Sequence, residues 1–370
     1  MSTLVRTSFA RATSALVQHF LLLVAGATLA VLSLLTVSKA HSQTVAATPP
    51  ALTQSPTLSR IQKRGRIELG YRQSAAPFSF ADKHDAPTGL AWSLCEAIVP
   101  AVANAIGAPR LETVPVRVIE QMRAPLVKGR AIDIDCAPST LTKERLSQVD
   151  FSLPYYAAHV RLMVRRGSGI GSLDGMRGLR LVVVQGTTAE RLAHARQPKI
   201  GFQLLMARDY DEAFHMLQER RAQAMALDDV LLEGLRVMSK TPEAFRLVGP
   251  PLSETPEYYA LVLPKDDPVF KAQVDSVLAE MFRSGDMARL QQRWFQTALR
   301  PGGVSMGMTP SAEVEALWEQ GARDTPPPAV RRADSARPPE DAVQPAVEPQ
   351  SQSSIAPRTV RPKHSHGRTV

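Results

Sequence analysis

The stretch DIDCAPSTLTKERLSQVDFS, residues 133–152, changes character within a few positions. Apolar side chains alternate with aspartates in its first residues, which is the pattern of a core strand. Two hydroxyl side chains, Ser139 and Thr140, follow at the end of that strand, and Arg145 lies in the helical-looking run beyond them. Hydroxyl groups, free helix N–H groups and an arginine at one strand end suit an anion. The stretch therefore predicts an α/β sheet with an anion site at its edge.

Strands and helices alternate on both sides of this stretch. In the first half, the pattern predicts strands over 66–72, 112–118 and 131–137, with helices over about 90–106 and 119–129. In the second half it predicts strands over 161–166, 178–186, 202–207, 222–229, 245–249 and 258–264. Of the further predicted helices, one starts at 189, one spans 209–220 and one ends near 239. The last three span 267–285, 286–297 and 311–319. Because a β-α-β-α-β order implies a parallel sheet, we expect two α/β units.

The first 40 residues have the features of a secretory signal peptide. An apolar run over 20–37 follows Arg11, and Ser38 and Ala40 occupy the third and first positions before His41. Small residues at those two positions suit a cleavage site. An uncleaved membrane anchor is the alternative, because about 18 apolar residues are the lower limit for a membrane span. In either case the remaining chain is expected to be exported, with the periplasm as its location.

Two further segments differ in composition from the α/β units. Residues 41–56 are polar, small and proline-rich, and they are interpreted as a linker. Residues 323–370 are rich in Pro, Ser, Arg and Ala and have few apolar side chains to bury. Such a segment cannot offset its chain entropy by burial, so we predict a disordered tail.

Charge and composition limit the classes of partner. The formal net charge is +9, both signs are interspersed through the middle of the chain, and aromatic residues make up 5%. A nucleic-acid-binding protein typically has a clustered basic patch, which this pattern does not provide. The chain has no CxxC motif and no two histidines at the H-x₃₋₅-H spacing of a zinc site, so no metal and no cofactor are expected.

The chain has two cysteines, Cys95 and Cys136. A disulfide between them can persist in an oxidising compartment. On the chain-entropy model, closing a loop of this length contributes about 3–4 kcal/mol. Two separately buried thiols are the alternative, because cysteine packs well in cores. The disulfide is the favoured interpretation.

Charged and hydroxyl residues occur at several predicted strand ends, where ligands bind in open α/β sheets. Arg72 closes the first strand, and Thr188 follows a second-half strand directly before a helix. A ligand carboxylate could accept hydrogen bonds from the hydroxyls and pair with Arg145. Asp228, at another strand end, could accept an ammonium group, while Arg72 and Arg123 offer positive charge for a second acidic group. The set predicts an α-amino acid as ligand.

Each of these residues also has a plainer interpretation. Ser and Thr after strands commonly cap helices or form turns. Arg145 beside Glu144 is typical of a solvent-exposed pair, and Asp228 with Asp229 suits the cap of a helix starting near Val230. The residues alone leave both interpretations open.

Six motifs nevertheless occur in the order found in family 3 extracellular solute-binding proteins, the periplasmic amino-acid receptors of ABC importers. They are GYRQSAAPFSF, GLAWSLCEAI, IDIDCAPSTLTKERLSQVDFS, VVVQGTTAERL, ALDDVLLEGL and LPKDDPVF. The resemblance covers roughly residues 57–320. It is strongest to the glutamate/aspartate-binding branch.

The resemblance implies a type II periplasmic-binding-protein fold, in which two α/β lobes close on a ligand in the cleft between them. Each lobe would be a mostly parallel sheet flanked by helices. Lobe 1 would comprise residues 57–156, lobe 2 residues 157–256, and residues 257–322 would return to lobe 1 and add the C-terminal helices. The two crossovers between lobes would lie near Pro154–His159 and Thr255–Tyr258.

Carried over position by position, the resemblance also assigns ligand-binding roles. Thr140, Arg145 and Thr188 would bind the α-carboxylate, and Asp228 the α-ammonium. The two remaining arginines would bind the side-chain carboxylate. The full expected ligand-binding set is Arg72, Arg123, Ser139, Thr140, Arg145, Thr188, Tyr210 and Asp228.

Three positions depart from the family pattern. Residues 137–140 are Ala-Pro-Ser-Thr where the branch usually has Gly-Ser-Thr-Thr, so Pro138 removes one hydroxyl and one N–H. Glu120 replaces a serine, and Tyr210 replaces a histidine. A buried Glu120 would repel an acidic ligand side chain or neutralise one arginine. The α-amino-acid half of the pocket is thus mostly kept, and the side-chain half is altered.

The resemblance implies a non-enzymatic, monomeric receptor. It would bind a polar or acidic amino acid of the glutamate/aspartate type and deliver it to an inner-membrane ABC permease with its ATPase. One alternative is a periplasmic dehydratase-like enzyme on the same fold, with Glu120 as its general acid or base. Another is a ligand sensor or scaffold that uses the basic, proline-rich tail.

Overall fold

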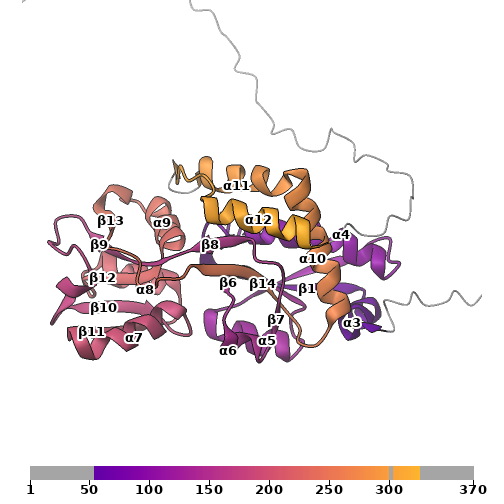
Figure 1. Ribbon diagram of the computed structural model, residues 1–370, viewed down its shortest axis with the longest axis horizontal. Coiled ribbons are helices and arrows are strands. Elements are labelled where there is room, and N and C mark those ends of the chain that lie inside the picture. The colour runs from indigo at the N-terminus through magenta and orange to yellow at the C-terminus, as the bar shows by residue number, and fades with distance from the viewer. Residues whose placement is uncertain (1–53, 300–302, 326–370) are drawn as a thin grey trace, which may run out of the picture. The chain divides into compact units, whose positions relative to one another are not determined.

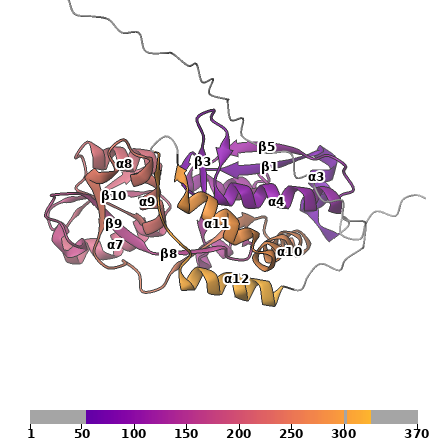
Figure 2. The ribbon, with the colours of Figure 1, turned by 90° about the horizontal axis from the view of Figure 1, so that it is seen from above.

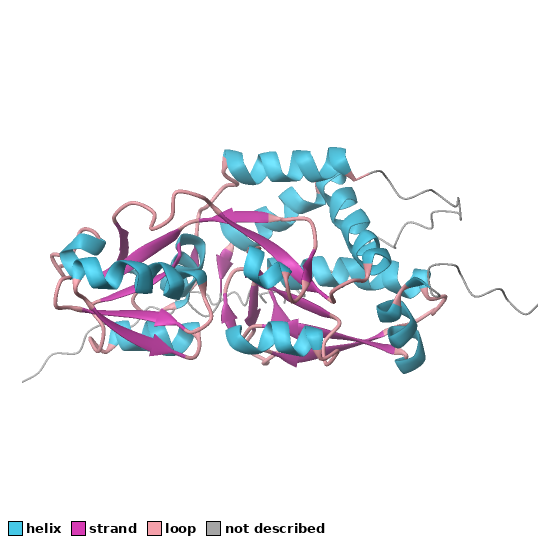
Figure 3. Ribbon diagram, turned by 60° about the horizontal axis from the view of Figure 1, so that its bottom comes forward, coloured by secondary structure: helices cyan, strands magenta, loops and turns pink. Residues whose placement is uncertain are grey.

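The computed structural model describes residues 54–299 and 303–325, which form two large β-sheets flanked by helices and two smaller sheets (Figures 1 and 3). The expected signal peptide (1–40), all but the last residues of the expected linker, and the expected tail beyond residue 325 lie outside the described residues. Within the described part, none of the helices is both long and apolar enough to span a membrane.

The first sheet has the strand order β5-β1-β6-β14-β7. Strands β1, β5 and β6 are parallel to one another, whereas β14 runs antiparallel to β6, β7 and β8. The strands are β1 (Arg66–Tyr71), β5 (Glu112–Arg117), β6 (Ile134–Thr140), β7 (Asp150–Phe151), β8 (Tyr156–Ala158) and β14 (Glu257–Leu263). A three-stranded sheet of β2 (Ser74–Ala75), β3 (Ser79–Ala81) and β4 (Pro87–Thr88) and a pair of β15 (Ala298–Leu299) and β16 (Val304–Ser305) are separate from it.

The second sheet has the order β11-β10-β12-β9-β13, with β10, β11 and β12 parallel and β9 antiparallel to both of its neighbours. Its strands are β9 (Val160–Arg165), β10 (Arg180–Val184), β11 (Gln203–Ala207), β12 (Ala224–Asp228) and β13 (Phe245–Val248). Successive residues of β10 are buried in clusters on opposite faces, such as Val183 and Val184. This burial on both faces explains why the strand is an unbroken apolar run.

Ten helices of the described residues flank the two sheets (Figures 1 and 3). Those beside the first sheet are α3 (Pro56–Arg64), α4 (Leu90–Ala105), α5 (Arg123–Lys128), α6 (Lys143–Leu146), α10 (Pro268–Ser284), α11 (Asp286–Gln296) and α12 (Ala312–Asp324). Those beside the second are α7 (Thr188–Ile200), α8 (Tyr210–Gln218) and α9 (Asp229–Met238). Short 3-10 turns are η1 (Glu120–Met122), η2 (Leu173–Met176) and η3 (Pro242–Ala244). We call the residues around the first sheet lobe 1 and those around the second, 160–248, lobe 2.

Several elements differ from the sequence-based prediction. Helix α3 begins at Pro56 with Ser55 as its cap, inside the segment interpreted as a linker. The helix predicted over 119–129 is the 3-10 turn η1 followed by α5, and the last helix continues to Asp324. In α12, the Trp318 indole N–H donates to the Tyr155 carbonyl over 2.8 Å, which ties this helix to lobe 1.

The chain passes between the lobes twice, and the two passages run side by side. Strand β8 pairs antiparallel with the first residues of β14, with Glu257 opposite Ala158 and Tyr259 opposite Tyr156. Figure 1 shows β8 and β14 near the middle of the molecule, and Figure 2 shows β8 beside the second sheet. They coincide with the two crossovers that the family resemblance implied. A pair of hydrogen-bonded strands is a suitable hinge, since it allows rotation of the lobes while fixing where they meet.

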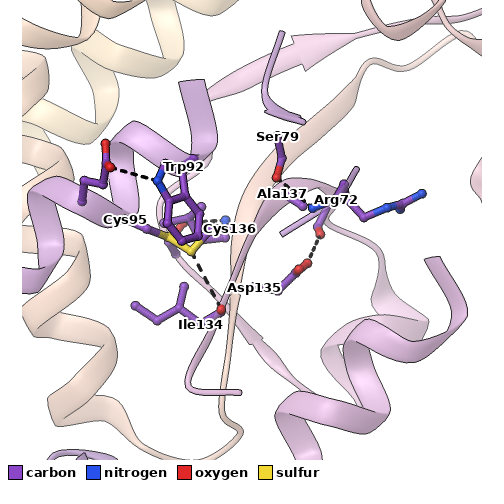
Figure 4. Close-up of a disulfide and its surroundings, with 12 residues drawn as sticks. Arg72, Ser79, Trp92, Cys95, Ile134, Asp135, Cys136 and Ala137 are labelled. Carbon is purple, nitrogen blue, oxygen red and sulfur yellow. Dashed lines mark hydrogen bonds between the residues drawn. A yellow bond between two sulfur atoms is a disulfide. The ribbon is translucent and has the colours of Figure 1, made fainter. Parts of the chain in front are cut away.

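The predicted disulfide joins Cys95 of α4 to Cys136 of β6 (Figure 4). Both residues are fully buried, and the bond closes a separation of 41 residues. It attaches the main helix of lobe 1 to the strand that continues into Ser139 and Thr140. The cross-link therefore stabilises the strand end at which the anion site was predicted.

Replacing both cysteines by alanine is expected to lower the free energy of unfolding by about 4 kcal/mol on the chain-entropy model. Urea unfolding of the variant and of the natural chain, each with and without reductant, measures the difference. Reductant should destabilise only the natural chain. Equal stability of all four samples would show that the bond does not restrict the unfolded state.

Candidate functional site

A buried carboxylate, that of Glu120, is the centre of the charged groups in lobe 1. Its Oε2 accepts from Arg72 Nη1 over 2.5 Å and from Arg123 Nη2, and its Oε1 accepts from Arg145 Nη2 over 3.1 Å. These side chains come from the end of β1, from η1, and from the first residues of α5 and α6. Arg72 is 1% exposed and Arg123 3% exposed, so the pairs with Glu120 are shielded from water.

The surrounding charges determine the protonation state of Glu120. Burial alone would raise the pKa of this carboxyl, but the positive charges of Arg123, Arg72 and Arg145 outweigh burial and lower its pKa to about 2. Glu120 is therefore ionised at neutral pH. Of the two effects expected for a buried Glu120, neutralisation of arginine is the one seen, and it involves three arginines rather than one.

Lobe 2 reaches the same group of residues. The Tyr210 hydroxyl, at the start of α8, lies 3.3 Å from Glu120 Oε2, and its ring lies 4.5 Å from Arg72 Cζ. Burial and the charge of Glu120 raise the pKa of Tyr210, so its hydroxyl keeps the proton it donates. Arg145 also donates to the Gly186 carbonyl of lobe 2 over 2.9 Å.

The two lobes touch closely at Gly186. Its φ of +80° lies in the region that favours glycine, and an added Cβ would come within 3.3 Å of Gln121 Cγ and 3.5 Å of Glu120 Cγ. Beside it, the Gln121 amide donates to the Gln185 side chain over 2.6 Å. Residues of both lobes thus form one polar interface around Glu120.

Ser139 and Thr140 lie within β6 rather than beyond it. Ser139 is fully buried, accepts from Arg123 and donates to Asp135 Oδ2 over 3.1 Å. The backbone carbonyl of Pro138 also accepts from Arg123 Nη1 over 3.1 Å, a contact that does not require a hydroxyl at this position. Ser139 therefore orients Arg123.

Arg145 is not the solvent-exposed partner of Glu144. Its guanidinium bridges the Thr140 carbonyl over 2.9 Å and Glu120, and its side chain is 20% exposed. Helix α6 is only four residues long, and Thr142 already accepts from the backbone N–H of Arg145. The helix N–H groups expected to contribute to an anion site are therefore few, and one of them is already bonded to Thr142.

The helix-cap interpretation applies to Thr187 rather than to Thr188. Thr187 is the N-cap of α7, and its hydroxyl accepts from the Glu190 N–H over 3.1 Å. Thr188, the first helical residue, is 6% exposed and lies two residues after Gly186, which contacts Arg145.

Asp228 ends β12 without acting as a side-chain cap. Its Oδ1 is buried and has no hydrogen-bond partner among the described residues. Burial and the negative charge of Glu257 raise the pKa of Asp228 to about 8. A buried acceptor oxygen without a partner is costly, so this position suits a hydrogen-bond donor such as an ammonium group.

Glu257 and Tyr259 on β14 were not among the predicted site residues. Each is buried and has a side-chain oxygen without a hydrogen-bond partner in the described part of the chain. Both belong to the predicted strand YYALVLP or directly precede it, and the alternation of that strand did not distinguish them from core residues. Their nearness to Asp228 follows only from the pairing of β14 with β8 at the crossover.

Two α/β lobes joined by paired crossover strands, with polar groups of both lobes at their interface, define a two-lobed binding protein. The sequence model of the family described as bacterial extracellular solute-binding proteins, family 3, matches residues 67–297 of this chain. The chain belongs to this family. The prediction of a binding protein rather than an enzyme is confirmed by this membership and by the relatives below.

Among curated proteins, the chain is 33% identical over 265 residues to the glutamate/aspartate import solute-binding protein of Salmonella typhimurium, covering 71% of this chain and 87% of that protein. It is 33% identical over 264 residues to the L-glutamate/L-aspartate-binding protein of Pseudomonas aeruginosa, covering 70% and 87%. A crystal structure of a mutant of ArgBP from T. maritima has a TM-score of 0.58 at 24% identity, covering 65% of this chain and 99% of that one. The first two confirm the resemblance to the glutamate/aspartate branch, and the third shows the fold.

The pKa of Asp228 leads to a testable pH dependence. Its folded pKa of about 8 exceeds the ordinary unfolded value, so the folded state binds more protons between about pH 4 and pH 8. The stabilisation that this group contributes is therefore complete at low pH and is lost as the pH rises through that window. The free energy of unfolding should fall there by up to about 1.4 kcal/mol per pH unit.

Urea unfolding from pH 4.5 to 8.5 should show a flatter loss of stability for Asp228→Asn than for the natural chain. Asp174→Asn, at an exposed position of η2, is the matched control and should follow the natural chain. Parallel curves for the natural chain and Asp228→Asn would contradict the assigned protonation of Asp228.

Proposed function

We propose that this protein is the periplasmic substrate-binding component of an ABC-type amino-acid importer. The observation that carries the proposal is the division of one polar site between two hinged lobes: Arg145 and Glu120 from lobe 1 meet Gly186 and Tyr210 from lobe 2. Such a site is complete only when the lobes are closed, so a ligand that contacts both lobes favours the closed form. The named substrates of the relatives support an amino acid as that ligand.

The proposed domain boundaries are residues 57–156 and 257–322 for lobe 1 and residues 157–256 for lobe 2. In the proposed ligand site, Arg145 with Thr140 and Thr188 binds the α-carboxylate, and Asp228 binds the α-ammonium. The buried Oδ1 of Asp228, which has no hydrogen-bond partner among the described residues, supports this half of the site. Arg72, Arg123, Ser139 and Tyr210 line the half that meets the ligand side chain.

The proposed partners are an inner-membrane permease and its ATPase, which receive the ligand from the closed protein. We propose that the protein acts as an exported monomer in the periplasm. The family description, which refers to extracellular solute-binding proteins, supports the export.

A dehydratase on this fold would need Glu120 to exchange a proton. A general acid or base works best with a pKa near the operating pH, whereas the three arginines lower the pKa of Glu120 to about 2. Both of its oxygens also accept hydrogen bonds within the protein. The geometry therefore favours binding over proton transfer.

Loss of Arg145 is expected to weaken amino-acid binding roughly 10- to 100-fold, because a charged hydrogen bond to a carboxylate contributes about 1.5–3 kcal/mol. Purified protein is unfolded and refolded to release bound solutes, and calorimetry with a panel of amino acids identifies the ligand. Arg145→Ala is then compared with Arg208→Ala, which removes the same charge from a side chain that is 78% exposed. Equal affinity of both variants would refute the carboxylate assignment.

Gly234 of α9 lies against lobe 1, where an added Cβ would lie 2.1 Å from the Ala76 carbonyl oxygen. Overpacking of this kind costs about 1–3 kcal/mol, so Gly234→Ala should lower ligand affinity by about tenfold or more. Gly175→Ala is the matched control, because an added Cβ there meets nothing within 4 Å.

Small-angle scattering with saturating ligand gives a second measurement on the same two variants. Gly234→Ala should keep a larger radius of gyration than Gly175→Ala. Full closure of Gly234→Ala at natural affinity would show that the contact with Ala76 is not part of the ligand-bound state.

A further inference from the structure

We propose that Glu120 is a built-in carboxylate that occupies the arginines of the side-chain subsite, so that the protein selects an α-amino acid with an uncharged, polar side chain over glutamate and aspartate. This inference rests on the proposed amino-acid-binding function and goes further, since it names the ligand class. The contacts of two buried arginines carry it.

Both terminal nitrogens of Arg123 already donate within the protein. Its Nη2 donates to Glu120, and its Nη1 donates to the Pro138 carbonyl and to Ser139. Its Nε lies 3.7 Å from Asp135 Oδ2, a second carboxylate that is fully buried. A bidentate pair between Arg123 and an incoming carboxylate would require breaking contacts that are already satisfied.

Arg72 has one terminal nitrogen left. Its Nη1 donates to Glu120, whereas its Nη2 is buried and has no hydrogen-bond partner among the described residues. Glu120 already supplies the counter-charge of the Arg72 guanidinium. The unpaired nitrogen therefore suits a neutral acceptor, such as the oxygen of a carboxamide or a hydroxyl group.

Charge leads to the same ligand class. The site holds three guanidiniums, of Arg72, Arg123 and Arg145, and two carboxylates, of Glu120 and Asp135. The α-ammonium of the ligand pairs with Asp228 in its ionised form, so one ligand carboxylate completes the balance. That carboxylate can pair with Arg145, whose side chain is the most accessible of the three arginines. A second ligand carboxylate would be a buried charge without a counter-charge, which is strongly unfavourable. A cationic side chain would meet Arg72.

Tyr210 closes this subsite from lobe 2. Its hydroxyl contacts Glu120 Oε2 and its ring covers the Arg72 guanidinium. The internal carboxylate therefore contacts groups of both lobes, as the ligand is proposed to do. Because Glu120 belongs to the chain, it loses no translational freedom when it pairs, and a ligand carboxylate cannot displace it without paying that entropy.

The decisive experiment compares near-isosteric ligand pairs on the refolded full-length chain. Calorimetry should show glutamine binding at least tenfold more tightly than glutamate, or asparagine at least tenfold more tightly than aspartate. Tighter binding of glutamate or aspartate overturns the inference while leaving the amino-acid-binding function in place. Absence of binding by any amino acid overturns the proposed function itself, which distinguishes the two failures.

Substitution of Glu120 tests the cause of the selectivity. In Glu120→Ser the acidic ligand can take the place of the internal carboxylate, so the preference should shift at least tenfold towards the acidic member of each pair. Glu219→Ser is the matched control, because that carboxylate is 59% exposed in lobe 2. An unchanged preference in Glu120→Ser would assign the selectivity to another residue.

Removing a carboxylate from three buried arginines can also prevent folding. Glu120→Gln keeps the size of the side chain and is the second variant, with circular dichroism and thermal unfolding to establish that it is folded. It should lose part of the discrimination against glutamate. The ligand comparison on the natural chain decides the inference independently of either variant.

Discussion

The lobe interface depends on the pairing of Glu120 with Arg72, Arg123 and Arg145. Three guanidiniums close together inside a protein repel one another and lose their hydration, so they require a nearby counter-charge. Breaking a buried ion pair by removing one partner typically costs 3–5 kcal/mol. The position of Glu120 therefore constrains every neighbouring side chain, and it is the reason that Ser139, Pro138 and Tyr210 all contact members of the same group.

The rest of lobe 1 holds this group in place. Strand β6 carries Ser139 and Thr140 to the interface, and the disulfide between Cys95 and Cys136 fixes that strand to α4. The crossover strands β8 and β14 pair directly beside it, with Tyr259 opposite both Thr140 and Tyr156. A ligand-induced rotation about this hinge would move lobe 2 against a rigid surface, since the groups of lobe 1 are bonded mainly to one another.

Much of the fold could be predicted because each pattern had a local physical cause. The unbroken apolar run of β10 reflects burial on both faces, and its following Gly-Thr-Thr marks a turn and a helix cap. The short helix α6 was harder to foresee, because the sequence KERL has good helix formers but the chain returns to the sheet at Asp150. The linker-like composition of residues 41–56 conceals the start of helix α3 at Pro56, although proline is well suited to the first turn of a helix.

The sequence by itself determined the two α/β units, the family and the residues able to form a carboxylate and ammonium site, because these depend on local periodicity and on motifs in a constant order. Only the tertiary structure decided how those residues are used. Arg145 and Glu144 are neighbours in the chain, yet the partner of Arg145 is Glu120, 25 residues away. Whether Glu120 would repel a ligand or pair with arginines depended on which charges the fold buries beside it, and burial is a property of the packed lobes rather than of any one segment.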